Sequence, residues 1–338
     1  MAGKGPVGFG RREAPEVDGP EAPAPFPDGA TKLDDAIAAA LLPERPVRGH
    51  KGSFGKLLIV AGSLDYAGAA LLVARAAGRA GSGLVTLAVP ESLQPMFAAK
   101  VVEATTMALP EDDVEEIDPE PAFARILDHE HDAIVIGPGL RPGLATAELV
   151  RRLIVADEPN AAPILLDAEA LRSLATMDDW WDGERRSAVL TPHAGEFARL
   201  RAGSGRDPDA DGDLVGDDDA RVAAARDGAA SWGQVVVLKG ARTVIATPDG
   251  QIAIAPFENP ALASGGTGDV LAGAIGSLLA QGLPPFDAAR ERLGDAGVLA
   301  SDLPDGLAIA RKRLAAIAAR KASGKRLGFG ARPADEPA

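Results

Sequence analysis

The sequence predicts an α/β protein whose central, mostly parallel sheet is covered by helices on both faces and carries an antiparallel hairpin at its edge. Short, wholly apolar runs such as Lys56–Ala61 (KLLIVA) suit strands that are buried on both faces. These runs alternate with helix-length segments, which is the arrangement that builds parallel sheets. Later in the chain, two short strand-like runs flank Pro248-Asp249-Gly250, a turn sequence typical of hairpins.

The expected elements can be placed in chain order. Strands are expected at 56–61, 84–89, 133–136, 163–167, 188–191 and 234–238, followed by the hairpin strands 243–246 and 251–255. Helices are expected at 67–80, 91–98, 145–155, 168–174, 194–201, 219–230, 269–281, 287–293 and about 306–319. Ligands of open α/β sheets bind outside the carboxyl ends of the strands, so we expect the functional site at that edge.

These elements fit one catalytic domain, residues 31–319, between two disordered tails, residues 1–30 and 320–338. Both tails are rich in Gly, Pro and charged residues and lack apolar periodicity. Each contains the tripeptide Gly-Phe-Gly, a repetition that we ascribe to chance composition.

Bulk composition excludes several classes of function. The 338 residues carry a net charge of −14, which disfavours nucleic acids and anionic membranes as partners. The absence of cysteine excludes disulfides, thiolate metal sites and thiol nucleophiles, and fits a reducing compartment. We find neither an apolar leader after Met1 nor eighteen consecutive apolar residues, and therefore expect a cytoplasmic protein.

The stretch 259–275 (NPALASGGTGDVLAGAI) carries most of the chemical information. Its glycines Gly265, Gly266 and Gly268 permit positive φ angles and a close approach of the backbone to a ligand. The apolar run after Asp269 indicates a helix, so this turn presents unpaired N–H groups that suit an anion. Asp269 has two interpretations. It caps the helix, or it is a base for a hydroxyl that attacks a phosphoryl group held by those N–H groups.

Other clusters of glycine and polar residues adjoin the expected strands. The segment 50–56 (HKGSFGK) precedes a strand and lacks P-loop spacing, and the segment 137–140 (GPGL) lacks the third glycine of a dinucleotide fingerprint. The segments 191–196 (TPHAGE) and 239–243 (KGART) each follow a strand. For His193 and Lys239, a structural role and a ligand contact both remain open.

Together these clusters resemble one family, the ADP/ATP-dependent NAD(P)H-hydrate dehydratases, whose fold is ribokinase-like. The resemblance covers roughly residues 35 to 310 in colinear order. GGTGD alone would indicate only the ribokinase-like fold, whereas its combination with TPH-G-E and KG-x-x-T in one chain is much more specific. The motifs that carry the resemblance are HKGSFGK (50–56), YAGAALL (66–72), VIGPGL (135–140), LLDAEAL (165–171), LTPHAGEFARL (190–200), VVVLKGARTVI (235–245) and NPALASGGTGDVLAGAI (259–275).

The resemblance implies a repair reaction on NADH or NADPH that has taken up water at carbon 6 of the nicotinamide ring. ADP or ATP, accompanied by Mg²⁺, would phosphorylate the ring hydroxyl of the S-form, and phosphate would then leave by elimination. Asp269 would be the catalytic base. Contacts to the hydrated dinucleotide are implied for Ala69, Gly139, His193 and Asp269. Contacts to the adenine nucleotide are implied for Lys239, Gly240, Ala241, Arg242, Thr243 and Gly268, and the backbone N–H groups of Gly266, Thr267 and Gly268 would form an anion hole. No dedicated protein metal site is expected.

Two other functions remain open: a ribokinase-like kinase of a vitamin precursor, and a non-catalytic nucleotide-binding protein. The glycines of GPGL and TPHAGE leave room for a large dinucleotide and favour the dehydratase, while a pure anion binder gains nothing from Asp269. The family often carries a fused epimerase domain, for which about 35 preceding residues are too few. We therefore expect a separate NAD(P)H-hydrate epimerase as functional partner, and a homo-oligomer. ADP and ATP both remain candidates.

Two segments depart from the family's pattern. Only a short segment separates Phe286 from Ala300, so one helix of the family is expected to be missing there. The acidic insertion Asp207–Asp219 (DPDADGDLVGDDD) has spacing similar to a Ca²⁺ loop, but we interpret it as a solvated surface loop. We interpret the segment around His129 and His131 as a polar loop in the same way.

Overall fold

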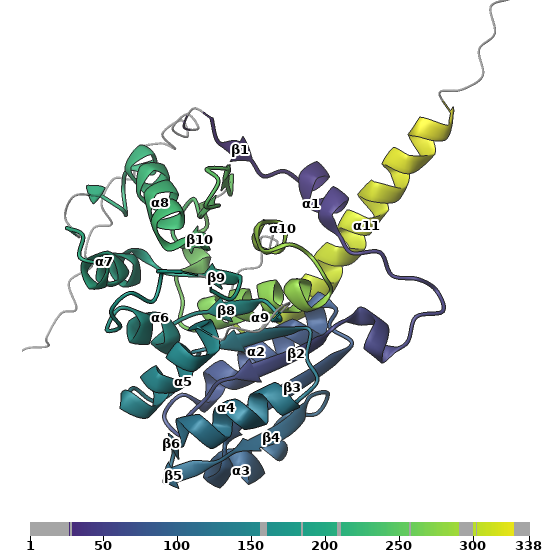
Figure 1. Cartoon of the computed structure of the whole chain (residues 1–338). Coiled ribbons are helices and arrows are strands. Elements are labelled where there is room, and N and C mark those ends of the chain that lie inside the picture. Colours follow the sequence, from purple (N-terminus) through teal and green to yellow (C-terminus); the bar gives the residue numbers. More distant parts are fainter. Residues whose placement is uncertain are drawn as a thin grey trace, which may run out of the picture.

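A computed structural model describes residues 27, 29–155, 161–183, 185–207, 211–256, 258–290, 300–301 and 303–327. Its centre is a ten-stranded sheet with the strand order β1-β12-β11-β10-β9-β8-β7-β2-β3-β4 (Figure 1). Six of these strands form the parallel body that the sequence predicts: β2 (Lys56–Val60), β3 (Leu84–Pro90), β7 (Ala133–Ile136), β8 (Ile164–Leu166), β9 (Ala188–Leu190) and β10 (Val235–Leu238).

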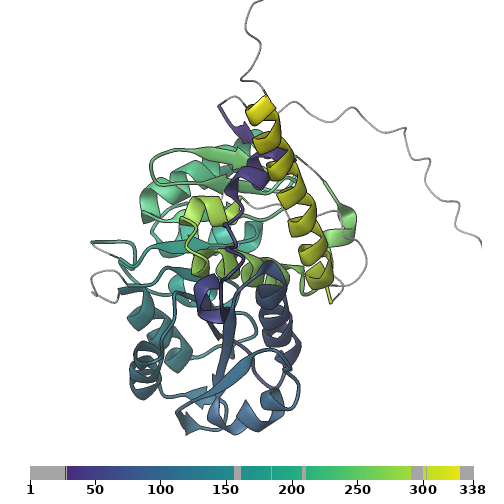
Figure 2. The same ribbon diagram turned by 90° about the vertical axis from the view of Figure 1, so that its right-hand side faces the viewer.

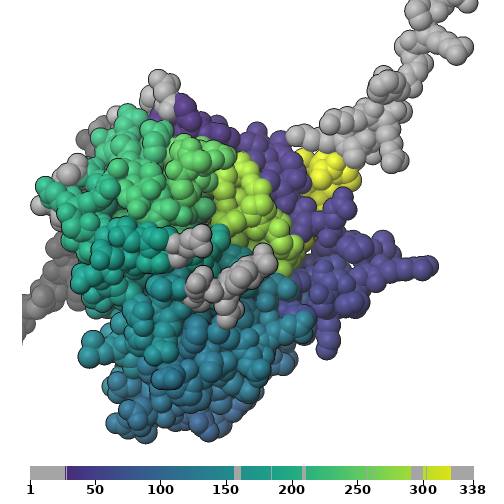
Figure 3. All heavy atoms as spheres, in the orientation of Figure 1, coloured from purple at the N-terminus to yellow at the C-terminus, as the bar shows by residue number. Residues whose placement is uncertain are grey.

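The edges of the sheet differ from the prediction. The hairpin strands β11 (Val244–Ala246) and β12 (Ile252–Ile254) are present, but β1 (Thr31–Lys32) pairs in parallel with β12 and is the outermost strand. β4 (Thr105–Leu109) forms the other edge. Figure 3 shows the purple surface of the N-terminal segment bordering the green and yellow-green surface of later parts of the chain.

A second, two-stranded sheet was also not predicted. Its strands β5 (Glu111–Asp113) and β6 (Glu116–Ile117) pair antiparallel and stand apart from the main sheet.

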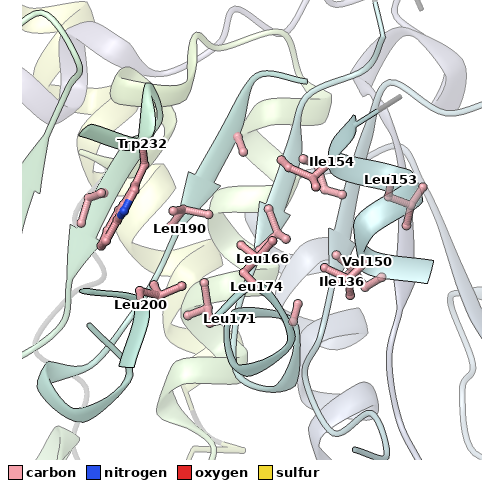
Figure 4. Close-up of a cluster of buried hydrophobic side chains, with 14 of the residues drawn as sticks. Ile136, Val150, Leu153, Ile154, Leu166, Leu171, Leu174, Leu190, Leu200 and Trp232 are labelled. Atoms are coloured by element: carbon pink, nitrogen blue, oxygen red, sulfur yellow. The ribbon is translucent and has the colours of Figure 1, made fainter. Parts of the chain in front are cut away.

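Helices cover both faces of the main sheet (Figures 1 and 2). The first face packs against α2 (Ala67–Ala80) and α9 (Thr267–Ala280), where Leu57 and Ile59 of β2 join the same buried cluster as α2 and α9 side chains. The second face buries Leu58 and Val60, because successive side chains of a strand point to opposite faces. This face is covered by α4 (Pro119–Asp128), α5 (Leu144–Val155), α6 (Glu169–Leu174), α7 (Ala194–Gly203) and α8 (Asp218–Trp232). Figure 4 shows part of this second cluster.

Glycines bring α9 very close to the sheet and to α2. A Cβ on Gly276 would lie 2.3 Å from Val135 Cγ2, and one on Gly273 would lie 2.4 Å from the carbonyl oxygen of Val73. Only glycine permits this packing, and it fixes the start of α9 relative to the strand ends.

Short helical elements complete the fold: α1 (Asp35–Leu41), η1 (Lys51–Phe54), η2 (Glu91–Leu93), α3 (Gln94–Ala98), η4 (Pro260–Leu262) and α10 (Pro285–Ala289). We predicted that one helix of the family is missing between Phe286 and Ala300. That segment consists largely of residues 291–299, which lie outside the described residues. The N-terminal tail prediction falls mainly on residues 1–26, which are also outside them. Among the described helices, none is both long and apolar enough to span a membrane.

The last helix corrects the predicted C-terminal tail in part. α11 runs from Leu303 to Leu327 and so extends into the segment 320–338 that was expected to be disordered. Its sequence is rich in Ala, Lys and Arg, which have high helix propensity. α11 packs against α2 and α1, where Leu314 is buried with Ala38 and Ala39. Residues 328–338 lie outside the described part of the chain.

Candidate functional site

The glycine turn lies where α9 begins. Gly266 is the N-cap residue, with φ 93°, and no side chain caps the helix. Thr267 Oγ1 donates to the carbonyl oxygens of Leu262 and Ser264, each at 3.0 Å, and holds the turn closed. Asp269 lies in the first turn of α9 without capping it. The capping interpretation therefore fails for Asp269, and its carboxylate is available for chemistry.

Asp269 sits in an environment that disfavours its charge. Burial, followed by the negative charge of Asp167, raises the pKa of Asp269 to about 6, and the positive charge of Lys239 only partly opposes this. A carboxylate with this pKa is still mostly ionised at neutral pH and is a stronger base than an exposed aspartate.

Asp167 immediately follows β8 and is 2% exposed. Its Oδ1 accepts hydrogen bonds from Lys239 Nζ at 2.7 Å and from Thr191 Oγ1 at 2.9 Å. Lys239 Nζ also lies 3.8 Å from a carboxylate oxygen of Glu196. Burial alone would lower the pKa of Lys239, but the carboxylates of Asp167 and Glu196 outweigh it and raise that pKa. Lys239 is therefore a firmly charged cation.

Gly268 faces this ion pair. A Cβ built on Gly268 would lie 3.5 Å from Lys239 Nζ and 3.8 Å from Asp167 Oδ2, both ordinary contact distances. The start of α9 thus brings Gly268 and Asp269 together with Asp167 and Lys239, at the carboxyl ends of neighbouring parallel strands.

His193 has the structural role that its sequence context left open. Its Nδ1 accepts hydrogen bonds from the backbone N–H groups of Gly195 (3.0 Å) and Glu196 (3.3 Å) and caps α7, while Glu196 Oε2 accepts from His193 N at 2.9 Å. In the neutral ring the proton is then on Nε2. The side chain is 56% exposed, so this N–H can also meet a ligand.

Ala69 and Gly139 lie beside each other. Gly139 follows β7 with φ 65°, and a Cβ there would lie 2.7 Å from the carbonyl oxygen of Tyr66 and 3.0 Å from Ala69 Cβ. Glycine is therefore required where the loop after β7 meets the start of α2. This close approach explains the GPGL segment without a dinucleotide fingerprint.

A cavity of about 470 Å³ adjoins the start of α9. Its lining is mainly apolar, and its volume falls within the range of small-molecule sites, about 300–1,000 Å³. Four of the five residues of the KGART segment line it, and Gly268 and Thr267 form part of its wall. The lining residues from these two segments are Lys239, Gly240, Ala241, Thr243, Thr267 and Gly268.

Arg242, the fifth residue of that segment, does not line the cavity. It is 3% exposed, and its guanidinium pairs with Asp218 at 2.9 Å and with Glu258 at 3.0 Å. A second buried arginine, Arg221, lies directly beneath Gly240 and donates to the carbonyl oxygen of Leu238 at 3.1 Å. The buried side chains of Arg221 and Arg242 thus hold the loop 239–243 in place.

Two acidic groups of the site had no role assigned from the sequence. Asp167 and Glu196 lie within the quoted motifs LLDAEAL and TPHAGE, but nothing in either segment indicates that both approach Lys239. The available indication was position, because Asp167 ends a predicted buried strand and Glu196 lies in the first turn of the helix predicted after another.

Other predicted features lie away from this cluster. Among the described residues, no group of three or more His, Asp or Glu side chains could hold a metal ion. The acidic insertion contains residues 208–210, which are not described. Within its described part, Asp211 pairs with Arg201 at 2.9 Å.

The chain is similar in sequence to proteins of known family. The sequence model of the NAD(P)H-hydrate dehydratase family matches residues 57–304. The chain is 40% identical to the bifunctional NAD(P)H-hydrate repair enzyme of Moorella thermoacetica over 81% of this chain and 52% of that protein. It is 37% identical to the ADP-dependent (S)-NAD(P)H-hydrate dehydratase of Neisseria meningitidis over 71% of this chain and 74% of that protein. The chain spans about half the length of the bifunctional relatives.

Solved structures agree in fold. The ADP/ATP-dependent NAD(P)H-hydrate dehydratase of Bacillus subtilis, co-crystallised with ATP and Mg²⁺, superposes with a TM-score of 0.68 at 31% identity, covering 85% of this chain and all of that one. A ribokinase-like superfamily protein of Enterococcus faecalis has a TM-score of 0.70 at 23% identity, covering 87% of this chain and 99% of that one. The fold is thus ribokinase-like, and the family match spans most of the domain. This chain belongs to the NAD(P)H-hydrate dehydratase family.

Proposed function

We propose that this protein uses ADP or ATP to dehydrate the S-form of hydrated NADH or NADPH and so restores the reduced cofactor. One observation carries the proposal: a half-buried carboxylate, Asp269, stands at a glycine-lined helix start that forms the wall of a nucleotide-sized cavity. Family membership supports the same activity.

The proposed chemistry has two steps. Asp269 takes the proton of the ring hydroxyl, whose oxygen then attacks the terminal phosphorus of the nucleotide and displaces AMP or ADP. The phosphate ester is then eliminated with a neighbouring ring proton, which re-forms the double bond. Hydroxide leaves poorly and phosphate leaves well, so phosphorylation makes the loss of water feasible.

The residues divide between the two ligands in this proposal. The backbone N–H groups of Gly266, Thr267 and Gly268 hold the transferring phosphoryl group, a type of contact worth a few kcal/mol per donor. The cavity receives the adenine nucleotide, with contacts from Lys239, Gly240, Ala241, Thr243, Gly268 and the backbone of Arg242. The hydrated ring lies on the opposite side of Asp269, against Ala69, Gly139 and the Nε2–H group of His193.

Mg²⁺ enters the proposal as the partner of the nucleotide phosphates, which are its usual ligands together with water. We also propose a homo-oligomer, and functional partnership with a separate NAD(P)H-hydrate epimerase that supplies the S-form. The cytoplasm is the proposed location, because the nucleotide co-substrate is abundant there.

A direct assay tests the activity. Purified protein is mixed with hydrated NADH or NADPH, Mg²⁺, and ADP or ATP, and the return of reduced-nicotinamide absorbance is followed. Recovery that requires a nucleotide supports the proposal. No recovery with either nucleotide, together with phosphorylation of a thiazole or pyridoxal alcohol, would establish a vitamin-precursor kinase instead. Adding the epimerase should allow the remaining R-form to be consumed as well.

A further inference from the structure

Lys239 and Asp167 form the tightest polar contact beside the proposed phosphoryl site. Lys239 lines the cavity, and its Nζ is 2.7 Å from Asp167 Oδ1. Asp167 does not line the cavity and is almost completely buried. Of the two groups, only the lysine is therefore placed to meet a nucleotide, and the aspartate acts from behind it.

The backbone around Asp167 is held in an unusual conformation. The next residue, Ala168, has φ 50° and ψ −116°, a region that side-chain-bearing residues rarely adopt and that costs about 1–3 kcal/mol. Gly137 accommodates this bend, because a Cβ there would lie 1.9 Å from the carbonyl oxygen of Asp167. Such strain persists only where the surroundings impose it.

The side chain of Asp167 is anchored on its other side as well. Thr191 Oγ1 donates to Asp167 Oδ1 at 2.9 Å and to the carbonyl oxygen of Leu166 at 3.2 Å. β8, β9 and β10 are adjacent in the sheet, so Asp167, Thr191 and Lys239 follow three neighbouring strands. The carboxylate is thus fixed before any ligand binds.

We propose that Asp167 is a positioning residue, which holds the Lys239 ammonium beside Gly268 where the phosphates of the nucleotide pass from the cavity to Asp269. The inference rests on the proposed function and adds to it a residue that touches neither ligand. Lys239 has four flexible methylene groups, and a fixed carboxylate removes most of their freedom before the nucleotide arrives. Glu196, at 3.8 Å, is too far to replace the direct hydrogen bond.

The arrangement also couples Asp167 to the base. Its negative charge adds to the effect of burial in raising the pKa of Asp269, and the charge of Lys239 opposes it. Removing either charge should therefore move the acid limb of the pH profile, in opposite directions for the two residues. A merely structural role for Asp167 would produce no such movement in the folded enzyme.

The test compares Asp167→Asn, Lys239→Met and the double variant with the wild type. Thr191→Val is the matched control, because it removes one hydrogen bond to the same carboxylate oxygen but keeps both charges. Two measurements are made on each folded variant: affinity for Mg²⁺-ATP by calorimetry without hydrated cofactor, and the pH profile of kcat/KM for dehydration.

We expect Asp167→Asn to lower kcat/KM about tenfold or more, the typical effect of losing a charge-assisted hydrogen bond. The acid limb of the pH profile of kcat/KM should move to lower pH in Asp167→Asn and to higher pH in Lys239→Met. The double variant should be little worse than the more damaged single variant, because one interaction is lost in all three. Thr191→Val should lower kcat/KM less than Asp167→Asn does, because Asp167 then keeps its charge and its hydrogen bond to Lys239.

Strictly additive effects, or wild-type kinetics and an unmoved profile in Asp167→Asn, would overturn the proposal. If Asp167→Asn does not fold, Lys239→Met decides, since wild-type affinity for Mg²⁺-ATP in that variant contradicts the role given to the lysine. A wild type that binds Mg²⁺-ATP but dehydrates nothing would refute the proposed function, and the affinity measurements would still test the Lys239–Asp167 pair.

Discussion

Two glycine-rich turns in this protein look alike in sequence but have different surroundings. The turn at 52–55 precedes β2, and a Cβ on Gly55 would lie 2.3 Å from the carbonyl oxygen of Ala280. The turn at 265–268 precedes α9, where a Cβ on Gly265 would meet no heavy atom within 4 Å and one on Gly268 would meet only the ends of two charged side chains. Gly55 thus lets the protein's own backbone approach, whereas Gly265 and Gly268 leave space, in the case of Gly268 beside a cation. Gly266, between them, is packed, because a Cβ there would lie 2.7 Å from Leu72 Cδ1.

The difference separates glycines that pack against the protein's own backbone from glycines that leave space for the phosphate that we propose. Only the second turn was predicted to hold an anion, because the first lacks P-loop spacing and precedes a strand, and only the second adjoins a cavity with Lys239 on its wall. The first turn instead follows His50, whose Nδ1 caps η1 as that of His193 caps α7. Substitutions in the two turns should therefore affect different properties.

The largest effect is expected for Asp269→Asn, which removes the base and leaves the second turn intact. kcat should fall about 10²- to 10⁴-fold, as for other general bases, while affinity for Mg²⁺-ATP should be retained. Steady-state kinetics and calorimetry on the same preparation measure both. A rate within a few-fold of wild type would contradict the role of base.

Among substitutions in the two turns, Gly55→Ala should be the most damaging to stability. The new methyl group collides with backbone, and residue 55 has φ 84°, so the free energy of unfolding should fall by about 3 kcal/mol or more. Gly265→Ala is the matched control and should change it by less than about 1 kcal/mol. Equal losses in urea unfolding would mean that the two turns do not differ in packing.

The pH dependence of the free energy of unfolding should show that the charge of Asp269, next to the second turn, destabilises the folded protein. The pKa of Asp269 is raised from 3.8 to about 6 in the folded state, so the folded protein binds a proton more tightly than the unfolded chain. Wild type should therefore lose stability relative to Asp269→Asn as pH rises from about 4 to about 6, by up to about 3 kcal/mol. Unfolding curves at intervals between pH 4 and pH 7 measure this gap; a gap that is constant across the range would refute the burial of charge at this position.

The smallest effect, and the sharpest separation of the two turns, is expected for Gly268→Ala. Its methyl group lies beside Lys239 without a clash, and alanine favours the helix by up to about 1 kcal/mol, so stability should be kept or raised. The same methyl group occupies the space proposed for the phosphoryl group, and affinity for Mg²⁺-ATP should fall about tenfold, or about 1.4 kcal/mol. Thermal unfolding measures the change in stability, and calorimetry measures the change in affinity for Mg²⁺-ATP. Undiminished affinity would mean that the phosphates bind elsewhere.

The parts of the fold that follow from local pattern were predictable. β7 and α2 match their expected bounds, because one is a wholly apolar run and the other a helix with a buried face of small residues. β4 was not predicted, since its sequence TTMAL is not a wholly apolar run and only Met107 and Leu109 of it are buried. α4 begins with Asp118 and Pro119, which suggest a turn but here cap and start a helix.

The site was predictable only where its residues are close in sequence. The glycine turn and Asp269 form one motif, and their placement at a helix start follows from it. The pair formed by Lys239 and Asp167 depends on the order of neighbouring strands, which a single sequence does not reveal. That Arg242 does not line the cavity was unpredictable for the same reason, because its partners Asp218 and Glu258 come from other segments.

The short strand β1 has a practical consequence for anyone who trims this chain. The match to the family's sequence model begins at residue 57, yet β1 closes the edge of β12, and Leu33 donates to the carbonyl oxygen of Ile254 and forms part of the cavity wall. A version cut at residue 57 would open the cavity and leave the apolar edge of Ile252–Ile254 bare. Bare edges pair with other chains, so such a product should aggregate during expression while the longer chain does not.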